Sequence, residues 1–395
     1  MVANTNYVIV NAHIVPVAGE PFHGSLVVTD GKIAALGVDV EAPQGHEVVD
    51  AAGSWLLPGL VDAHVHLGVH EEGEGWAGAD VNETTDPVTA AVRAVDAINP
   101  SDIGFDDALA GGITSVNVNP GSANPIGGLA VAIKTHGRIV DEMILRSPSG
   151  LKAALGENPK RVYGEQKKTP NTRLGVAMTM RKALAEARAW AKKPEEDRGA
   201  DLVSEALGMV LAREIPWRQH CHRADDIATA IRLSDEFGYE LVLDHGTEAY
   251  KLADVIAERH IPVLYGPMIV ARSKVEVRDR TAEAPGILTA AGVKVSIITD
   301  HPVVPIDFLI HQAAYAVREG LDPVEALRAV TINPAEVLGV EDRIGSLEVG
   351  KDADVVLWSG DPLDTRNRAL RTWIDGREVY SYDVGSRTGT VLERW

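Results

Sequence analysis

The feature that most constrains the fold is an alternation of short apolar segments with helical segments between about residues 59 and 340. Runs of strand length precede helical runs, as in ELVLDHG before EAYKLADVIAERH and VKVSIITDH before DFLIHQAAYAVREG. Strands that alternate with helices of this length predict parallel βαβ units. Roughly 280 residues are available, and a closed (β/α)8 barrel typically takes about 250. The pattern therefore predicts an α/β TIM barrel, with a doubly wound sheet as the alternative.

The alternation is clear after residue 215 and indistinct between residues 120 and 200. Within that stretch, KALAEARAWAKKPEEDRGADLVSEALGMVLARE is strongly helical, with its charges spread over a solvated face. The run GENPKRVYGEQKKTPNTR is polar and rich in helix breakers. We expect it to form a long loop over one end of the barrel.

Both ends of the chain have the sequence pattern of short β-strands. YVIVNAHIV and GSLVVTDG near the N-terminus, and ADVVLWSG and ALRTWIDGREVYSY near the C-terminus, cluster β-branched residues between turn signals. Two β-rich ends around a long middle indicate one small β-sandwich domain built from residues 1–58 and 346–395. Residues 59–345 then form the barrel domain.

Charge and composition narrow the class of protein. The formal net charge of −19 argues against nucleic-acid binding and against docking on anionic membrane. No stretch approaches the ~20 apolar residues of a transmembrane helix, and the N-terminal segment does not resemble a signal peptide. The single cysteine, Cys221, excludes an intrachain disulfide and favours a reducing compartment. We expect a cytoplasmic protein with a small-molecule substrate; whether it forms a homo-oligomer stays open.

Histidines occur in pairs at the ends of two predicted barrel strands. His64 and His66 lie two residues apart in LVDAHVHLG, and His220 and His222 lie two apart in PWRQHCH. Side chains at that spacing on a strand project to the same face, so both imidazoles of a pair can reach one metal ion. Cys221 must point to the opposite face, and we expect it to pack in the core.

Two further polar residues end apolar predicted strands, His245 in ELVLDHG and Asp300 in VKVSIITDH. A carboxylate after a buried strand is costly unless it meets a cation. Barrel enzymes place their active sites at the C-terminal ends of the strands. The set therefore predicts a divalent-metal site at the barrel mouth, with zinc favoured and manganese or iron as alternatives.

These segments also carry a resemblance to a known family. PGLVDAHVHLG, HCHRADD, LDHGTE, TDHP, TINPAEVLGVEDRIGSLEVGKDADVVLWSGDP and WIDGREVY together resemble the amidohydrolase superfamily, and within it the imidazolonepropionase-like group. The resemblance covers nearly the whole chain apart from residues 120–200. It implies a metal-bearing barrel with a small β-sandwich made of both termini. The metal ligands that it implies are His64, His66, His220, His245 and Asp300.

The resemblance further implies a bridging carboxylate, either a carbamylated lysine or a glutamate on the third or fourth strand. In SGLKAALGENPKR, Glu157 follows the predicted strand, whereas Lys152 lies near its predicted start. A ligand belongs at the C-terminal end of a strand, so Glu157 is preferred over Lys152. If neither bridges, the site holds a single metal, so the sequence leaves one or two ions open.

The chemistry expected of this site is hydrolysis of a C–N bond in an amide or a cyclic amide. A divalent metal lowers the pKa of bound water toward ~7 and polarises the carbonyl group. Asp300 is expected to accept the proton and pass it to the leaving nitrogen, with His245 or His222 beside the developing oxyanion. His222, Arg223 and His301 follow predicted strand ends and are the candidates for substrate binding.

Two other classes of function stay open. The same metal site can serve deamination, lactone hydrolysis or decarboxylation, because function resides in the site and not in the fold. The other class is a catalytically inactive scaffold. Its metal content would separate a scaffold from both kinds of enzyme.

Overall fold

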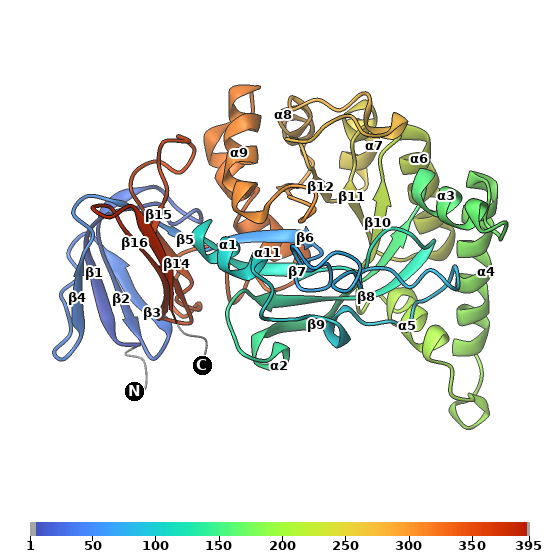
Figure 1. The fold of residues 1–395 in the computed structure, drawn as a ribbon, viewed down its shortest axis with the longest axis horizontal. Helices are drawn as coiled ribbons and strands as arrows, with labels where there is room; N and C mark the ends of the chain where they lie inside the picture. Colours follow the sequence, from blue (N-terminus) through green and yellow to red (C-terminus); the bar gives the residue numbers. More distant parts are fainter. Residues whose placement is uncertain (1–4, 393–395) are drawn as a thin grey trace.

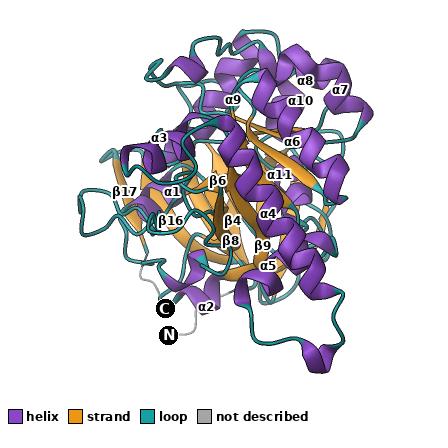
Figure 2. Ribbon diagram, turned by 90° about the vertical axis from the view of Figure 1, so that its right-hand side faces the viewer, coloured by secondary structure: helices purple, strands orange, loops and turns teal. Residues whose placement is uncertain are grey.

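Two β-sheets organise the chain in the computed structural model, which describes residues 5–392 (Figure 1). One sheet has eight strands from the middle of the sequence, and the other has nine strands from both ends. Figure 2 shows helices packed around the strands of the eight-stranded sheet. Among the described residues, no helix has both the length and the hydropathy that crossing a membrane requires.

The eight-stranded sheet keeps its strands in sequence order and closes on itself. The His66 N–H donates to the carbonyl oxygen of His301 at 2.9 Å, which joins the first strand to the segment after the last. The Asp62 carboxylate accepts from the Thr299 N–H (3.0 Å) and hydroxyl (2.6 Å) across the same seam. The predicted TIM barrel is confirmed, and the doubly wound alternative is excluded. Its strands are β6 (Leu60–Val65), β7 (Ile113–Val118), β8 (Ile126–Lys134), β9 (Ile144–Ala154), β10 (Trp217–Cys221), β11 (Leu241–His245), β12 (Val263–Tyr265) and β13 (Val295–Ile297).

Strand β8 departs from the repeating barrel pattern. It runs antiparallel to both of its neighbours, β7 and β9, whereas the other paired strands of this sheet are parallel. Residues 119–125 alone connect β7 to β8, and a parallel crossover needs a dozen or more residues. The chain therefore returns as a hairpin in place of a strand–helix unit. This is why the sequence shows no alternation after residue 120.

Helices follow the later barrel strands, and one of them contradicts the sequence prediction. The polar run predicted to be a loop contains helix α3, with Pro159 as its third residue. Proline is tolerated in a first helical turn, where its missing N–H has no partner to lose. The helices are α1 (Gly104–Ala110), α2 (Val140–Met143), α3 (Glu157–Glu165), α4 (Arg173–Ala191), α5 (Leu202–Leu211), α6 (Ala224–Phe237), α7 (Ala253–Glu258), α8 (Ala284–Ala290), α9 (Leu309–Arg318), α10 (Pro323–Arg328) and α11 (Ile332–Leu338). Short 3-10 helices occupy Ala94–Asp96, Glu195–Asp197, Ala249–Leu252, Val275–Val277 and Ile306–Phe308.

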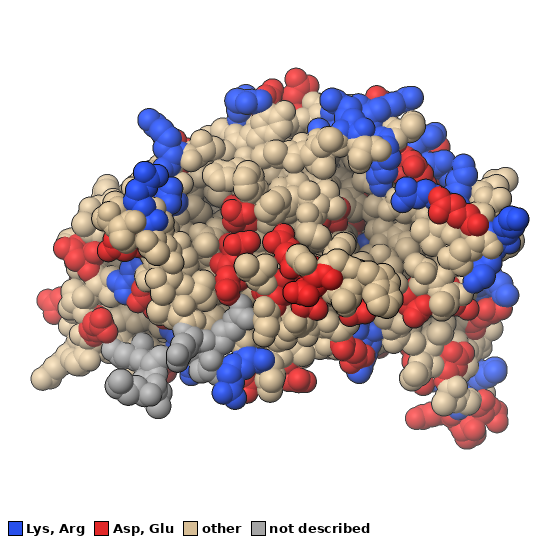
Figure 3. All heavy atoms as spheres, viewed as in Figure 1, with Lys and Arg blue, Asp and Glu red and all other residues tan. Residues whose placement is uncertain are grey.

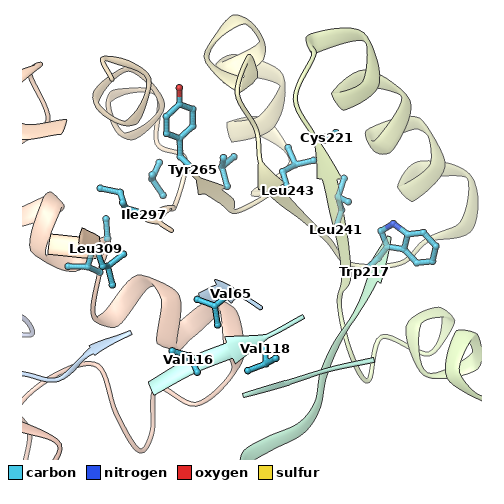
Figure 4. Packing of buried hydrophobic residues seen from close by; sticks show 14 of the residues in the cluster. Val65, Val116, Val118, Trp217, Cys221, Leu241, Leu243, Tyr265, Ile297 and Leu309 are labelled. Atoms are coloured by element: carbon cyan, nitrogen blue, oxygen red, sulfur yellow. The ribbon is translucent and has the colours of Figure 1, made fainter. Parts of the chain in front are cut away.

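Aliphatic side chains make up most of the main core, which joins the barrel strands to the surrounding helices (Figure 4). Val116 and Val118 of β7, Trp217 of β10 and Leu243 of β11 are buried in it. Cys221 is fully buried in the same cluster, and burial raises the pKa of its thiol well above the ordinary value. A thiol in that state is a poor nucleophile and a poor metal ligand.

The nine-stranded sheet joins the two ends of the chain. Strand β5 pairs with β1 from the N-terminal segment and with β14 from the C-terminal segment, where Leu57 lies opposite Val356. Tyr7 of β1 stacks on Trp373 of β15 with ring centroids 5.9 Å apart, although β14 and β5 separate these strands in the sheet. The sheet thus folds over a core of its own. Its strands are β1 (Tyr7–Ile14), β2 (Phe22–Thr29), β3 (Lys32–Gly37), β4 (Glu47–Asp50), β5 (Trp55–Pro58), β14 (Val355–Trp358), β15 (Ala369–Ile374), β16 (Arg377–Asp383) and β17 (Thr388–Val391).

From this sheet we propose that the chain divides as the sequence suggested. Residues 1–58 and 346–395 form a composite β domain, of which residues 5–58 and 346–392 are described. Residues 59–345 form the barrel domain.

Lys134 connects the barrel to the composite sheet through a buried ion cluster. This last residue of β8 places its ammonium 3.0 Å from Asp352 and also contacts Asp354, and both carboxylates are buried. Asp375, whose carboxylate is 3.3 Å away, is exposed. Burial lowers the pKa of Lys134, but the charges of Asp354, Asp375 and Asp352 outweigh it and raise the pKa above its usual value.

Replacing Lys134 by methionine should destabilise the fold strongly. The change leaves the buried Asp354 without its cation, whereas Asp352 keeps Arg343 at 2.7 Å and Lys32. Breaking a buried ion pair in this way costs about 3–5 kcal/mol of unfolding free energy. Denaturant titration of the two proteins measures the difference. The matched control is Lys32→Met, because Lys32 contacts the same Asp352 from a half-exposed position and should contribute about 0–1 kcal/mol. Equal losses in the two variants would contradict the assigned role of Lys134.

Candidate metal centre

Histidine and aspartate side chains from four barrel strands converge at the C-terminal ends of those strands. His64 lies near the end of β6, and His66 follows it. His220 lies on β10, with His222 just beyond the strand, and His245 is the last residue of β11. Asp300 follows β13, which closes the barrel against β6.

The distances place these groups around one point. The Asp300 Oδ1 atom lies 3.4 Å from His64 Nε2 and 3.3 Å from His66 Nε2. His64, His245 and Asp300 each present one ligand atom within 4.8 Å of the others. The His220 ring centroid lies 4.5 Å from that of His245. The structure therefore groups His64, His245 and Asp300, with His66 beside Asp300 and His220 beside His245.

Every imidazole in this group is held through its Nδ1 atom. The Nδ1 partners are Asp244 Oδ2 for His64 (2.9 Å), the Asn119 carbonyl for His66 (2.8 Å), Ser122 Oγ for His220 (2.9 Å), Thr247 Oγ1 for His222 (2.8 Å) and the Gly266 carbonyl for His245 (2.9 Å). Such outer contacts orient metal-binding histidines and fix their tautomer. The opposite nitrogen, Nε2, is then the atom available to a cation.

Three of these Nε2 atoms are buried and have no hydrogen-bond partner among residues 5–392, namely those of His64, His220 and His222. An unsatisfied buried polar atom costs about 1–3 kcal/mol. Three such atoms next to a carboxylate form a nitrogen and oxygen donor set that suits a divalent cation. The residues present therefore fit a metal ion.

The ionisation states agree with metal binding. Burial lowers the pKa of His245 to about 3 and lowers the pKa of His220 and His222 well below the ordinary value, which keeps their rings neutral. Burial raises the pKa of Asp300, but the neighbouring imidazoles, His245 first, outweigh it and hold the pKa well below its usual range. His64 is the exception: Asp244 outweighs burial and raises the pKa, so this ring must release a proton when its Nε2 binds a metal ion. Neutral imidazoles and an ionised carboxylate are the forms that bind metals.

The residues predicted to bind substrate occupy different surroundings. His222 lies in the centre, with its ring 5.0 Å from that of His245. His301 is fully buried, and neither ring nitrogen has a hydrogen-bond partner among the described residues. Arg223 instead turns outward, where its guanidinium forms two hydrogen bonds with Asp225 at 2.8 and 2.9 Å.

The two candidates for a bridging ligand also differ in position. Glu157 begins α3, and its side chain lines a surface hollow with Lys160 and Arg161. Strand β9 ends at Ala154, so Lys152 lies at its C-terminal end and not near its start, as the sequence had suggested. The Lys152 ammonium is buried and donates to Ser122 Oγ at 2.8 Å. Because Ser122 also holds His220, Lys152 is one hydroxyl group away from the cluster.

Asp244 and Arg218 support the site and were missed by the sequence reasoning. Both are fully buried, and the Asp244 carboxylate holds His64 with one oxygen and accepts from Arg218 at 3.1 Å with the other. Burial raises the pKa of Asp244, but Arg218 and His64 outweigh it and hold the pKa below its usual range. The available signal was an acidic residue inside the apolar run ELVLDHG.

Comparisons with known proteins identify the family of the chain. The sequence model described as the amidohydrolase family matches residues 55–382. The chain is 30% identical to the amidohydrolase tasK of Hapsidospora irregularis over 91% of its own length, and it spans 39% of that protein. It is 26% identical to the imidazolonepropionase of Pseudomonas fluorescens, covering 89% of this chain and 90% of that protein. A solved amidohydrolase structure from Thermotoga maritima is 48% identical, with a TM-score of 0.92, and the match covers 94% of this chain and 99% of that chain.

Asp244→Asn should weaken metal binding without removing a ligand. The variant keeps the shape of the side chain but loses the charge that holds His64, and the loss of such a partner typically lowers metal affinity 10–100-fold. Competition with a chelator measures the change. Asp225→Asn is the control, because Asp225 pairs with the exposed Arg223 and should leave metal affinity unchanged. If both variants bind metal as the wild type does, Asp244 has no orienting role.

Proposed function

The chain belongs to the amidohydrolase family, and on that premise we propose that it is a metal-dependent hydrolase that cleaves the C–N bond of an amide or cyclic amide in a small molecule. The observation that carries the proposal is the set of imidazoles held through Nδ1, with Nε2 atoms directed at the Asp300 carboxylate. A purely structural histidine cluster has no need of several unsatisfied buried nitrogens.

We propose that the metal is held by His64, His66, His220, His245 and Asp300, with zinc favoured and manganese or iron as alternatives. When bound, a divalent metal supplies a Lewis acid that lowers the pKa of water toward ~7 and polarises a carbonyl group. The number of ions, one or two, depends on whether a further anionic ligand joins these residues.

Asp300 is the residue that we assign to proton transfer. Its carboxylate is ionised at neutral pH because the surrounding imidazoles hold its pKa low. It can therefore accept a proton at Oδ1 or Oδ2 and return it to the leaving nitrogen. His245 is fixed by the hydrogen bond from its Nδ1 to the Gly266 carbonyl and stays neutral, so we assign it to binding and orientation.

His222 is the group that we assign to the developing oxyanion. Its Nε2 atom is buried without a partner among the described residues, while Nδ1 is held by Thr247. For this role the Thr247 hydroxyl donates to Nδ1, so the neutral ring carries its proton on Nε2 and His222 is not a metal ligand. The Nε2–H can then donate a hydrogen bond to an oxygen that gains charge during the reaction.

Lys152, and not Glu157, is the residue that we propose as the further anionic ligand. Burial lowers the pKa of Lys152 to about 8, which raises the fraction present as free amine. Carbon dioxide adds to the free amine: an N–C bond forms, one proton leaves the nitrogen, and the neutral amine becomes a carbamate anion. On neighbouring strands, Lys152 lies beside Arg218, and both are buried near Asp244. A carbamate would remove this excess of positive charge.

Lys152→Ala should therefore lose much of the bound metal, whereas Glu157→Gln should keep the wild-type amount. Elemental analysis of the purified variants measures the stoichiometry, and added short-chain carboxylic acids should partly restore metal to Lys152→Ala. Wild-type protein grown with carbon-13-labelled bicarbonate should show a carbamate signal by NMR. Metal loss in Glu157→Gln with full metal in Lys152→Ala would reverse the assignment.

Asp300→Asn should lower turnover far more than it weakens substrate binding. The change keeps the shape of the side chain but removes a basic group, and a lost proton-transfer group typically costs ~10²–10⁴-fold in rate. A panel of N-acyl amino acids, cyclic imides, lactones and aminated heterocycles first identifies a substrate for the metal-loaded enzyme. The split between kcat and KM on that substrate then tests Asp300, and near-normal kcat would remove it from the mechanism.

A further inference from the structure

The loop after β12 crosses the mouth of the barrel. This segment, the β12 loop (residues 266–283), leaves β12 and reaches helix α3, which follows β9, although β10 and β11 separate β9 from β12 in the sheet. In the loop, Glu276 accepts a hydrogen bond from the Glu157 N–H at 2.7 Å. Lys274 donates to Asn158 Oδ1 at 3.1 Å. Both contacts lie at the N-terminal end of α3.

Glu276 fixes the β12 loop tightly in this position. Its side chain is 2% exposed, and it pairs with Arg173, which also pairs with Asp226 of α6. Gly156 has a φ of +89°, and a Cβ there would lie 2.6 Å from a Glu276 oxygen. Since only glycine fits beneath this carboxylate, the loop is seated closely on α3 and the position of Lys274 is set by the fold.

Lys274 carries its charge toward the candidate metal centre. Between β12 and α3 the loop passes the C-terminal ends of β10 and β11, which lead to His222 and His245, and Lys274 lies at its α3 end. The charge of Lys274 acts on His222 and Asp300 from this position. Among residues 5–392, Lys274 donates to the neutral Asn158 amide, and the charges of Glu276, Asp300 and Glu157 act on it without a direct ion pair. A half-buried ammonium whose direct partner is a neutral amide can still form a charge-assisted hydrogen bond with an anion that binds beside it.

The surface outside the β12 loop carries several cations although the chain as a whole is acidic. Lys160, Arg161, Arg173 and Arg223 line a hollow of about 560 Å³ together with Glu157, Glu165 and Glu276, and Arg173 and Arg223 are paired with carboxylates. Figure 3 shows Lys and Arg side chains gathered toward the upper right of the molecule, where Figure 1 places α3, α6 and α7, while Asp and Glu gather over the middle. Such a field favours the approach of negatively charged molecules.

We propose that Lys274 binds an anionic group of the substrate, a carboxylate in the simplest case, beside His222. The inference rests on the proposed hydrolytic function and narrows its substrate class to amides or cyclic amides that carry a negative charge. Lys274 is then a specificity-determining residue: it holds the charged end of the substrate so that the scissile bond lies over His222 and Asp300. The alternative is that Lys274 only fastens the loop to Asn158.

The test uses the metal-loaded full-length chain and matched pairs of probes, N-acetyl amino acids with a free carboxylate and the same compounds as carboxamides. Steady-state kinetics give kcat/KM for each hydrolysed pair, and calorimetric titration gives Kd for each pair that is not hydrolysed. The wild type should prefer the carboxylate by about 10–100-fold, as expected for a hydrogen bond to a charged group. Lys274→Gln, which retains a hydrogen-bond donor but no charge, should abolish this preference and leave the carboxamides within about threefold.

Two further variants separate charge from loop anchoring. Lys274→Arg should recover part of the preference, and Asn158→Ala, which removes the anchoring bond but keeps the ammonium, should retain it. A preference that survives Lys274→Gln, or is lost in Asn158→Ala and Lys274→Gln alike, overturns the proposal. If Lys274→Gln does not fold, the carboxylate-to-carboxamide ratio of the wild type still tests the proposal. A ratio near one contradicts a carboxylate site. Binding of carboxylates with no metal-dependent turnover of any probe would instead overturn the proposed hydrolysis and leave the anion site in place.

Discussion

The burial of five imidazoles and one carboxylate at the mouth of the barrel is the constraint on which the rest of the structure depends. Burying polar groups here is unfavourable unless they form hydrogen bonds. Each imidazole has two nitrogen atoms, and the fold gives one of them, Nδ1, a hydrogen-bond partner in all five rings. The partners come from strands and loops around the barrel, so the histidines are oriented by the closed sheet as a whole. The second nitrogen, Nε2, is left to bind a cation.

Backbone strain at two of these residues points the same way. His245 has a φ of 72° and Asp300 a φ of 56°, both in the left-handed region that non-glycine residues rarely adopt. Strain of this kind costs about 1–3 kcal/mol at each position and persists where surrounding structure enforces it. His245 is the last residue of β11 and Asp300 lies just beyond β13, and the turn at each residue brings its side chain over the centre. The fold therefore tolerates local strain in order to place ligands.

The sequence predicted the parts of the site that follow from local periodicity. His64 and His220 lie on strands whose two-residue repeat can be read directly, His66 directly follows β6, and Asp300 ends an apolar run. Lys152 was misjudged because β8 replaces a strand–helix unit by a hairpin, so no alternation marked where β9 ends. Asp244 and Lys274 were missed because their roles depend on residues more than a hundred positions away, His64 and Asn158. Contacts of that range come from closure of the barrel, which no single segment encodes.

The central claim is that these side chains hold a divalent metal through Nε2 and carboxylate oxygen atoms. Anomalous X-ray diffraction from crystals of the purified protein, measured at the absorption edge of the metal found by elemental analysis, locates the ion directly. The account predicts one or two ions within about 2.0–2.2 Å of His64 Nε2, His66 Nε2 and an Asp300 oxygen, as is usual for zinc with these ligands. Crystals of metal-supplemented protein that show no ion there, or an ion bound elsewhere, would contradict it.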